Sequence, residues 1–457
     1  MSRTLKKRAY VETYGCQMNI SDGELMEGLL EDEGYEIVSV PEEADVILVN
    51  TCAIREHAER RVLGRVGQLH GLKRDRPELI LGVTGCMAQR MGHSLLEQAP
   101  YIDLVMGPDG YRSLPERLED VSEGRRARPS RSSKKRGPQL AVLDLSLDES
   151  YEGLAQRRTS RVSAWVPIQR GCDHRCTFCI VPYVRGGEKN RRPVEVLRDI
   201  DGVVASGVTE VTLLGQTVNS YEAEGWSFPQ LLRAVARVDG IERVRFMSPH
   251  PRDVTRKLID LMANEVAVCE HLHLPVQAGS DRTLRRMLRR YSVHDFLEKV
   301  ALVRKAIPDI SLSTDVIVGF PGETPEEFEE TLELLRTVRF DEAYTYRFSP
   351  REGTPATRLP FKDFVSDAEA QRRLERLIDV QRSIQSEINR REVGRVEEVL
   401  VEKEARDRHQ VLGRTRRNKV VAFAGSPDLI GDYYTVRLTD TTGATFIGEP
   451  FEAPVTL

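Results

Sequence analysis

The sequence lacks the features that would place the protein in or across a membrane. No run among its 457 residues approaches the ~18 uninterrupted apolar residues of a membrane span. The N-terminus, Met-Ser-Arg-Thr-Leu-Lys-Lys-Arg, is basic but has no apolar core of a signal peptide. We therefore expect a cytoplasmic protein. In that reducing compartment, its seven cysteines favour metal-binding or catalytic roles over disulfides.

The sequence also lacks a strong excess of charge of either sign, because its net charge is only -4. This value alone does not indicate a nucleic-acid partner, so any RNA-binding face must be local. With 40% apolar and 30% charged residues, the composition is that of an ordinary globular protein. The length is sufficient for about three domains.

One short segment concentrates three of the cysteines. Cys172, Cys176 and Cys179 have the spacing C-x3-C-x2-C, and the short turns between them put all three sulfurs on one loop. Thiolates suit zinc or iron-sulfur clusters. A 4Fe-4S cluster usually takes four of them, so a loop with no fourth cysteine nearby leaves one iron open. The alternatives are a structural zinc site completed by His174 and three unligated cysteines, which the loop geometry disfavours.

The N-terminal domain, which we place at residues 8–124, alternates strand-like and helical patterns. Strands are predicted at residues 9–13, 45–50, 79–84 and 103–107. The apolar run Val-Ile-Leu-Val within the second is typical of a buried parallel strand. Ser21 is predicted to begin a helix, with Glu24 completing a capping box. The pattern predicts an open parallel sheet.

A cysteine follows each of the first three predicted strands. Cys16, Cys52 and Cys86 are separated by 36 and 34 residues, which is about one βαβ unit each. Because parallel strands end along one edge of a sheet, these residues are expected to converge there. This predicts a second three-thiol site. The alternative is that each is an ordinary buried cysteine, which is how we interpret Cys269, since it has no partner thiol in reach.

A basic segment separates this domain from the next, and we assign residues 125–157 to a linker. Its basic residues are Arg125, Arg126, Arg128, Arg131, Lys134, Lys135 and Arg136. Such a run can contact phosphates, although a solvated connector is the commoner explanation.

The central domain, residues 158–390, repeats the alternation six times. Strands are predicted at residues 164–169, 210–214, 243–247, 271–275, 312–318 and 343–348. This pattern predicts an open (β/α)6 barrel, in which chemistry occurs at the C-terminal ends of the strands. The three-cysteine loop follows the first strand. The same rule nominates Gln216, Asn219, His273, Gln277, Ser280, Asp315 and residues 319–323, each of which has an alternative role in barrel core or turn.

A helix capped by Ser366 and Glu369 leads into the C-terminal domain, residues 393–456. Short alternating strands predicted at residues 396–401, 411–415, 419–423, 433–438 and 445–448 fit a small OB-like β-barrel. Residues 403–419 are locally basic. Arg414, Arg416 and Arg417 are candidate RNA contacts, and the alternative is a charged, solvated face.

The three-cysteine loop resembles the radical S-adenosylmethionine (SAM) superfamily, whose hallmark CxxxCxφC has an aromatic residue at φ, here Phe178. The resemblance implies a catalytic 4Fe-4S cluster held by Cys172, Cys176 and Cys179, with SAM on the open iron. Segments 214–221 and 314–323 resemble those that line the SAM site. They imply contacts from Gln216, Asn219 and Asp315, with Phe178 beside the cofactor. The usual Gly-Gly-Glu motif is absent, with Gly215-Gln216 in its approximate place.

Residues 14–19, 50–56 and 84–89 resemble the N-terminal domain of the methylthiotransferases, which holds an auxiliary 4Fe-4S cluster. The resemblance covers nearly the whole chain. It implies that Cys16, Cys52 and Cys86 hold that second cluster. The last domain resembles the TRAM domain, an RNA-binding module.

Gln-Met-Asn after Cys16, and Arg55-Glu56, resemble the MiaB-type branch of this family. That branch methylthiolates C2 of N6-isopentenyladenosine at position 37 of tRNA, with SAM as methyl donor and radical source. The implied partners are the tRNA anticodon stem-loop and an electron donor such as flavodoxin or ferredoxin, and we expect a monomer.

Two alternatives to this substrate remain. Relatives that modify threonylcarbamoyladenosine or a ribosomal-protein aspartate usually have Lys in place of the Gln. A different class is a cluster-carrying RNA-binding protein without catalysis.

Overall fold

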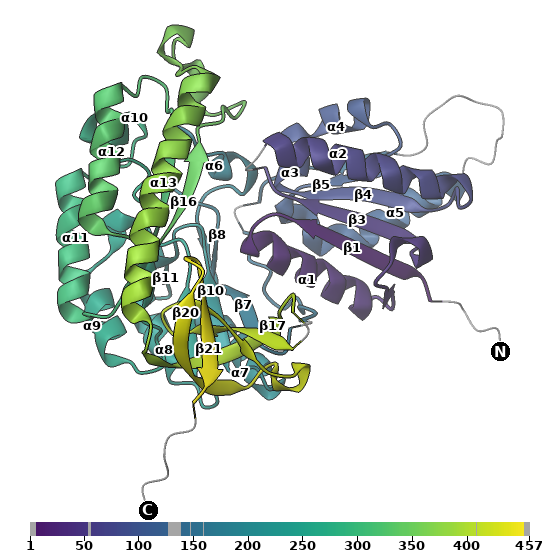
Figure 1. Cartoon of the computed structure of the whole chain (residues 1–457). Coiled ribbons are helices and arrows are strands. Elements are labelled where there is room, and N and C mark those ends of the chain that lie inside the picture. Colours follow the sequence, from purple (N-terminus) through teal and green to yellow (C-terminus); the bar gives the residue numbers. More distant parts are fainter. Residues whose placement is uncertain are drawn as a thin grey trace, which may run out of the picture. The chain divides into compact units, whose positions relative to one another are not determined.

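The computed structural model describes residues 6–53, 56–126, 139–146, 148–158, 160–407 and 409–451 (Figure 1). The chain divides into two compact units. The N-terminal unit comprises Met1–Thr159, Gln169–Arg175 and Cys179–Arg191, and the C-terminal unit comprises Ser160–Ile168, Cys176–Phe178 and Arg192–Leu457. Within the described residues, no helix has the length and apolarity needed to cross a membrane.

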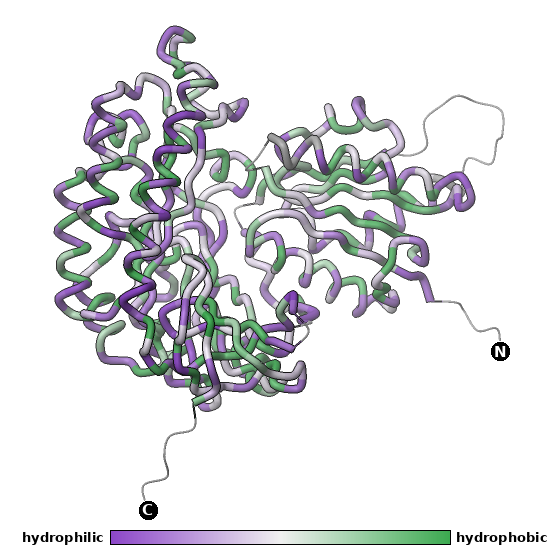
Figure 2. The backbone as a smooth tube through the Cα atoms, in the orientation of Figure 1, coloured by the Kyte–Doolittle hydropathy of each residue, from purple (hydrophilic) through white to green (hydrophobic). Residues whose placement is uncertain are grey.

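The N-terminal unit is built on a six-stranded parallel sheet of order β2-β1-β3-β4-β5-β6. Its strands are β1 (Arg8–Tyr14), β2 (Glu36–Ile37), β3 (Val46–Thr51), β4 (Ile80–Gly85), β5 (Leu104–Met106) and β6 (Leu140–Val142). Strands β3 and β4 are buried along their whole length, and their chain is coloured mainly as hydrophobic in Figure 2. Continuous apolar runs of this kind are expected where helices cover both faces.

Five helices cover the sheet: α1 (Gln17–Asp32), α2 (Glu56–His70), α3 (Cys86–Met91), α4 (His93–Gln98) and α5 (Leu114–Arg126). Side chains of α1 and α5 form one hydrophobic core with the sheet, and those of α2, α3 and α4 form the other. The four predicted strands are confirmed. The two-residue strand β2 was not predicted, because it is too short for an alternating pattern to be visible.

The predicted helix start at Ser21 is wrong. Helix α1 begins at Gln17, and Cys16 is its extended N-cap residue. The Cys16 carbonyl accepts backbone hydrogen bonds from Asn19 and Ile20 at 2.9 and 3.1 Å. The capping-box pattern at Ser21 therefore falls inside a helix that the preceding strand end has already started.

The linker assignment is wrong for residues 139–146. Strand β6 lies in this stretch and pairs in parallel with β5, and Tyr151 farther on is buried in the core of the N-terminal unit. The assignment followed the basic composition of the preceding residues too far into an apolar segment. Arg125 and Arg126 end helix α5, whereas the other basic residues of the segment lie outside the described residues.

The C-terminal unit contains the six predicted barrel strands in two parallel sheets, β13-β10-β7 and β14-β15-β16. They are β7 (Ser163–Pro167), β10 (Glu210–Leu214), β13 (Arg243–Phe246), β14 (His271–His273), β15 (Ser311–Val318) and β16 (Glu342–Arg347). Among the described residues, a parallel bridge between Val244 and Val268 joins the two halves. In the part of the chain that the structure describes, no ladder joins β7 to β16, so the barrel is open.

Most helices around these strands share one large hydrophobic core. They are α7 (Pro193–Ala205), α8 (Phe228–Ala236), α9 (Arg256–Asn264), α11 (Val293–Ala306), α12 (Pro325–Val338) and α13 (Asp367–Glu392). The short helix α10 (Asp281–Arg286) contributes Leu284 to a smaller cluster. Helix α13 begins as predicted, because the Ser366 hydroxyl accepts a hydrogen bond from the Glu369 N–H at 3.3 Å. It leads into the last domain.

The last domain is the predicted small barrel, closed in the order β17-β18-β19-β21-β20. Its strands are β17 (Val396–Glu404), β18 (Gln410–Thr415), β19 (Val420–Ala424), β20 (Tyr433–Thr441) and β21 (Thr445–Pro450). Alternate residues of these strands, such as Val399, Val401, Phe423 and Phe446, fill its interior. This inside-outside alternation made the strands visible in the sequence.

Candidate metal centres

The structure places Cys16, Cys52 and Cys86 together at one end of the N-terminal sheet. Cys16 and Cys52 follow β1 and β3, and Cys86 is the first residue of α3 after β4. The Cys16 and Cys52 side chains share a hydrogen bond, which lowers the pKa of Cys16 to about 6. Burial raises the pKa of Cys86, and Cys16 adds to that rise. The parallel topology thus gathers three thiols that are remote in sequence.

Two glycines allow the backbone to crowd these thiols together. Gly15 and Gly85 precede Cys16 and Cys86 and have positive φ angles of 143° and 92°. A Cβ on Gly15 would lie 2.6 Å from the Cys52 Cβ, and one on Gly85 would lie 2.5 Å from the Thr51 carbonyl oxygen. Only glycine fits such positions without strain. Gly15 and Gly85 therefore let the strand ends that carry these cysteines approach one another closely.

A buried arginine contacts this three-thiol site. Arg185 follows the short helix α6 (Val181–Val184), and its side chain is 3% exposed. Its Nε donates to Cys86 Sγ at 3.2 Å, and its Nη2 donates to the Asp22 carboxylate at 2.6 Å. Its Nη1 is buried without a hydrogen-bond partner among the described residues. Burial opposes this charge, but Asp22, Cys86 and Cys16 together raise the pKa of Arg185 well above its ordinary value.

These surroundings fit an anionic, thiolate-bound group. Three cysteines are the soft donor set of an iron-sulfur cluster. A permanent cation with an unused N–H beside them suits the negative charge of such a cluster. Cys16, Cys52 and Cys86 are thus suited to hold a 4Fe-4S cluster.

The loop that carries Cys172, Cys176 and Cys179 runs from β8 (Gln169–Arg170) to α6. Cys172 and Cys176 are buried, each 7% exposed, and Cys179 is partly exposed. The Cys172 thiol lies 3.9 Å from the His174 backbone carbonyl. All seven cysteines belong to the described part of the chain, and none forms a disulfide. The remaining one, Cys269, is buried, as its predicted structural role requires.

Cys176 also has an arginine donor. The Nη1 of Arg289 lies 3.4 Å from Cys176 Sγ, and its Nη2 donates to the Pro275 carbonyl at 3.0 Å. Burial opposes the charge on Arg289, but Tyr291 and Cys176 raise its pKa above the ordinary value. Phe178 packs against a small hydrophobic cluster that includes Met287 and Phe320. The aromatic residue of the cysteine motif thus belongs to the hydrophobic packing of the C-terminal unit.

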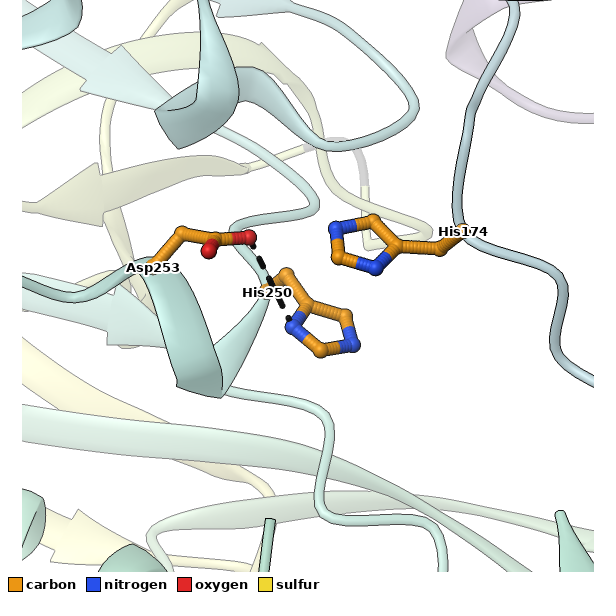
Figure 3. Close-up of side chains that lie close together, drawn as sticks. All are labelled: His174, His250 and Asp253. Atoms are coloured by element: carbon orange, nitrogen blue, oxygen red, sulfur yellow. Dashed lines mark ion pairs between the residues drawn. The ribbon is translucent and has the colours of Figure 1, made fainter. Parts of the chain in front are cut away.

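The candidate SAM contacts after β10 have different surroundings. Gln216 has a buried side-chain oxygen without a hydrogen-bond partner among the described residues. In Asn219, by contrast, Nδ2 donates to the His250 carbonyl at 3.0 Å and Oδ1 accepts from the His250 N–H at 2.7 Å. His250 itself lies 3.7 Å from Asp253 (Figure 3). Gln216 therefore offers an acceptor to a ligand, whereas Asn219 joins the loops after β10 and β13.

The nominated residues of the other barrel half belong mainly to structural networks. Asp315 lies within β15, and its carboxylate is 3.5 Å from His273 Nε2. His273 Nδ1 in turn lies 3.0 Å from the Ser313 hydroxyl. Ser280 is the N-cap residue of α10, and Gln277 pairs with Val316. With its side chain 26% exposed, Asp315 keeps access to a ligand.

The turn at residues 319–323 has a structural explanation. Glu323 accepts a hydrogen bond from the Gly319 N–H at 2.7 Å and pairs with Arg373 of α13, also at 2.7 Å. The Glu323 side chain is fully buried. Thr324 then caps α12. This segment is the tight turn that the sequence offered as its alternative.

The three candidate RNA contacts have partners within the C-terminal unit. Arg414 pairs with Glu402 at 2.8 Å, Arg416 with Glu270 at 2.9 Å, and Arg417 with Glu392 and Glu397 at 2.8 and 2.5 Å. The last two arginines connect the small barrel to the open barrel and to α13. Their predicted RNA contacts remain a prediction, and Lys403 and Arg406 are exposed on the same domain.

Sequence reasoning missed the charged residues around the thiols, namely Asp22, Arg185 and Arg289. One signal was available for Asp22. It lies four residues after Met18 and three before Leu25, which are both buried, so a carboxylate occupies the buried stripe of α1. A charge in such a stripe indicates a buried partner. Arg55, part of the substrate motif, lies outside the described residues.

Three family models match the chain. They are the uncharacterized protein family UPF0004 at residues 8–107, the radical SAM superfamily at residues 166–335, and the TRAM domain at residues 390–451. The superfamily match implies a 4Fe-4S cluster and SAM. A radical SAM methyltransferase, TsrM from Kitasatospora setae, has the same fold, with a TM-score of 0.57 over 77% of each chain at 17% identity.

Relatives named tRNA-2-methylthio-N(6)-dimethylallyladenosine synthase match along nearly the whole chain. The protein of Thermoanaerobacter sp. (strain X514) is 45% identical over 97% of this chain and 92% of its own length. That of Chloroherpeton thalassium is 44% identical over 97% and 96%. With this identity and coverage, the chain belongs to the family of the tRNA-2-methylthio-N(6)-dimethylallyladenosine synthases.

Proposed function

We propose that this chain methylthiolates C2 of N6-isopentenyladenosine at position 37 of tRNA, giving 2-methylthio-N6-isopentenyladenosine. The observation that carries the proposal is 45% identity, over 97% of the chain, to a relative named for this reaction. The radical SAM and TRAM matches supply the two parts that the reaction needs, a radical source and an RNA-binding module.

Cys172, Cys176 and Cys179 hold the cluster at which SAM binds. When bound, this cluster and SAM supply the 5'-deoxyadenosyl radical, which removes hydrogen from an aromatic carbon that no ordinary base deprotonates. Arg289 donates a hydrogen bond to Cys176 and so helps to orient this ligand. The unpaired oxygen of Gln216 is suited to accept a hydrogen bond from SAM. Asp315 remains a candidate second contact.

Cys16, Cys52 and Cys86 hold a second 4Fe-4S cluster, which supplies the sulfur. Support comes from the convergence of the three thiols and from the buried Arg185 beside them. A chemical argument agrees: a cluster held by Cys172, Cys176 and Cys179 would be engaged with SAM, so sulfur would have to be supplied at a separate three-cysteine site. Two three-cysteine sites in one chain separate these two tasks.

The anticodon stem-loop of tRNA is the macromolecular substrate, and an external donor such as flavodoxin or ferredoxin supplies electrons to a monomeric enzyme. Arg414, Arg416 and Arg417 are the candidate phosphate contacts. Replacing all three by Gln should weaken tRNA binding and reduce its salt dependence by about one unit of slope per lost contact. An unchanged slope would limit these residues to their observed ion pairs.

The test of the reaction uses reconstituted protein, SAM, a reductant and synthetic anticodon stem-loops. Mass spectrometry of the nucleosides should find the 2-methylthio product with isopentenyladenosine at position 37 and none with unmodified adenosine. Product only with threonylcarbamoyladenosine, or only on a ribosomal-protein aspartate, would reassign the substrate. A non-catalytic RNA-binding protein would form neither methionine nor 5'-deoxyadenosine.

A further inference from the structure

One carboxylate on α1 contacts both flanks of the SAM-site cysteine loop. Asp22 lies 2.6 Å from Arg185 and 3.8 Å from Arg170. Arg170 stands two residues before Cys172, and Arg185 stands six residues after Cys179. Asp22 also lies on the helix that begins directly after Cys16. All these residues belong to the N-terminal unit.

Hydrophobic contacts also connect the segment after Cys179 with the strand ends of the N-terminal sheet. Ile180, the residue after Cys179, forms a buried cluster with Val184, Ala53 and Cys86. Ala53 is next to Cys52, so this cluster contacts two of the three strand ends. The segment that leaves the SAM-site loop is therefore packed against the ligands of the other site, and Arg185 is held at its end.

Charged side chains gather around Asp22. Arg170, Arg185 and Lys189 are positive, Asp22 and Asp109 are negative, and all five side chains are at most 7% exposed. Glu149 adds a carboxylate that acts on both Arg170 and Lys189. Buried charges are costly unless they are paired and hydrogen-bonded. The hydrogen bonds that Arg185 donates to Asp22 and to Cys86 therefore help to hold its charge in place.

The two arginines that contact Asp22 also have buried hydrogen-bond donors that are not used among the described residues. Arg185 Nη1 and all three guanidinium nitrogens of Arg170 are buried without a hydrogen-bond partner among the described residues. The Arg170 guanidinium is instead stacked 3.5 Å above the Tyr151 ring. Donors of this kind are costly unless an anionic group uses them.

We propose that Asp22, Arg170 and Arg185 form a charge clamp that positions Cys86 and sets the reduction potential of the auxiliary cluster. Arg185 is the positioning residue, because it alone of the three donates to a cysteine sulfur, and Asp22 fixes its orientation. A donated hydrogen bond and a nearby positive charge both stabilise the reduced, more negative cluster. The inference rests on the proposed auxiliary cluster.

The first test isolates that cluster in the full chain. In a Cys172→Ala/Cys176→Ala/Cys179→Ala background, reconstituted protein is titrated electrochemically and followed by EPR. Arg185→Gln should lower the reduced-to-oxidised ratio about tenfold at a fixed potential, equivalent to a shift of about 59 mV for a one-electron couple. Arg185→Lys, which keeps the charge but loses the planar donor geometry, should shift it less.

Arg243→Gln in the same background is the matched control. Arg243 is equally buried and binds Glu398 and the Arg414 carbonyl, so its loss should leave the potential unchanged. A potential in Arg185→Gln equal to that of the background protein would overturn the clamp. A background protein that binds no iron would overturn the auxiliary cluster itself, and the clamp with it.

The second test uses protein with all its cysteines. Arg185→Gln and Asp22→Asn should retain most 5'-deoxyadenosine formation while 2-methylthio product falls at least tenfold. The ratio of the two products separates a role at the auxiliary site from a general loss of folded enzyme, which would reduce both together. An unchanged ratio in both variants would contradict the proposal.

Discussion

The two three-cysteine sites contain the same residue type, but their cysteines are brought together in different ways. Cys172, Cys176 and Cys179 lie on one loop, so their proximity is a local property of the chain. Cys16, Cys52 and Cys86 follow three different strands and meet only because the sheet is parallel and correctly ordered. The first site depends on a turn, and the second depends on a whole domain. Damage to the N-terminal fold should therefore affect the second site more.

The surroundings of the two sites are nevertheless alike. Cys172 follows Gly171, which has a φ of 72° and whose added Cβ would overlap the Gly187 carbonyl oxygen, just as Gly15 and Gly85 precede cysteines at the other site. Each site also has one buried arginine that donates to one cysteine, Arg289 at Cys176 and Arg185 at Cys86. Close backbone approach and one fixed cation are common to both.

The largest expected effect is the loss of both reaction products when the loop that carries Cys172, Cys176 and Cys179 is changed. Cys176→Ala should abolish both 5'-deoxyadenosine and 2-methylthio product, because the cluster that binds SAM loses one of only three protein ligands. Liquid chromatography of the SAM cleavage products measures this directly, with Cys269→Ala as a control that removes a buried cysteine outside both sites. Retained SAM cleavage in Cys176→Ala would remove the basis for assigning this loop.

The corresponding substitutions at the other site should separate 5'-deoxyadenosine formation from methylthiolation. Replacing Cys16, Cys52 and Cys86 by Ala should roughly halve the iron content, leave 5'-deoxyadenosine formation largely intact and eliminate methylthiolation. The physical reason is that radical formation and sulfur delivery then belong to different sites. Iron analysis and nucleoside mass spectrometry on one preparation check both parts. Methylthiolation of an isopentenylated stem-loop by this variant would show that the sulfur comes from elsewhere.

Sequence patterns predicted both groups of candidate cysteine ligands but not their charged surroundings. The C-x3-C-x2-C spacing is local, and strand-end positions follow from topology, so both were visible. Arg185 and Arg289 come from elements whose packing against the thiols depends on the tertiary fold. Asp22 could have been suspected from its place in an apolar stripe. No periodicity, however, indicates which cation it binds.

The same limit explains the errors in the fold. The strands were predicted because alternation and apolar runs are intrinsic to them, whereas β6 followed a basic segment whose composition suggested a linker. Arg416 and Arg417 are predicted RNA contacts because they form a local cluster of positive charge, but the sequence did not indicate their ion pairs. The acidic residues that pair with them, Glu270 and Glu392, are 146 and 25 positions away. Local composition carries no information about such distant partners.

A smaller effect is expected from Arg289, the arginine of the SAM site. Arg289→Met removes the hydrogen bonds that Arg289 donates to Cys176 and to the Pro275 carbonyl, so we expect about tenfold slower SAM cleavage at normal iron content. Methylthiolation should fall by the same factor, because it depends on the radical. In Arg185→Gln, by contrast, methylthiolation should fall while most 5'-deoxyadenosine formation is retained. The matched control is Arg304→Met, since Arg304 donates to the Arg339 carbonyl. If the ratio of 2-methylthio product to 5'-deoxyadenosine changed equally in Arg289→Met and Arg185→Gln, the two arginines would not act on separate sites.

The smallest expected effect tests the dependence of the auxiliary site on close backbone packing. Gly85→Ala forces a side chain into a positive φ and places its Cβ against Thr51 and Asn50, so it should cost about 1–3 kcal/mol of folding free energy. Gly34→Ala, in the same unit, has a φ of 83° but open space around its Cβ, and it should cost only the conformational part of that penalty. Denaturant unfolding measures the difference, and iron analysis should show loss from the auxiliary site in Gly85→Ala alone. Equal destabilisation with full iron content in both variants would mean that crowding at the strand ends does not hold these three cysteines together.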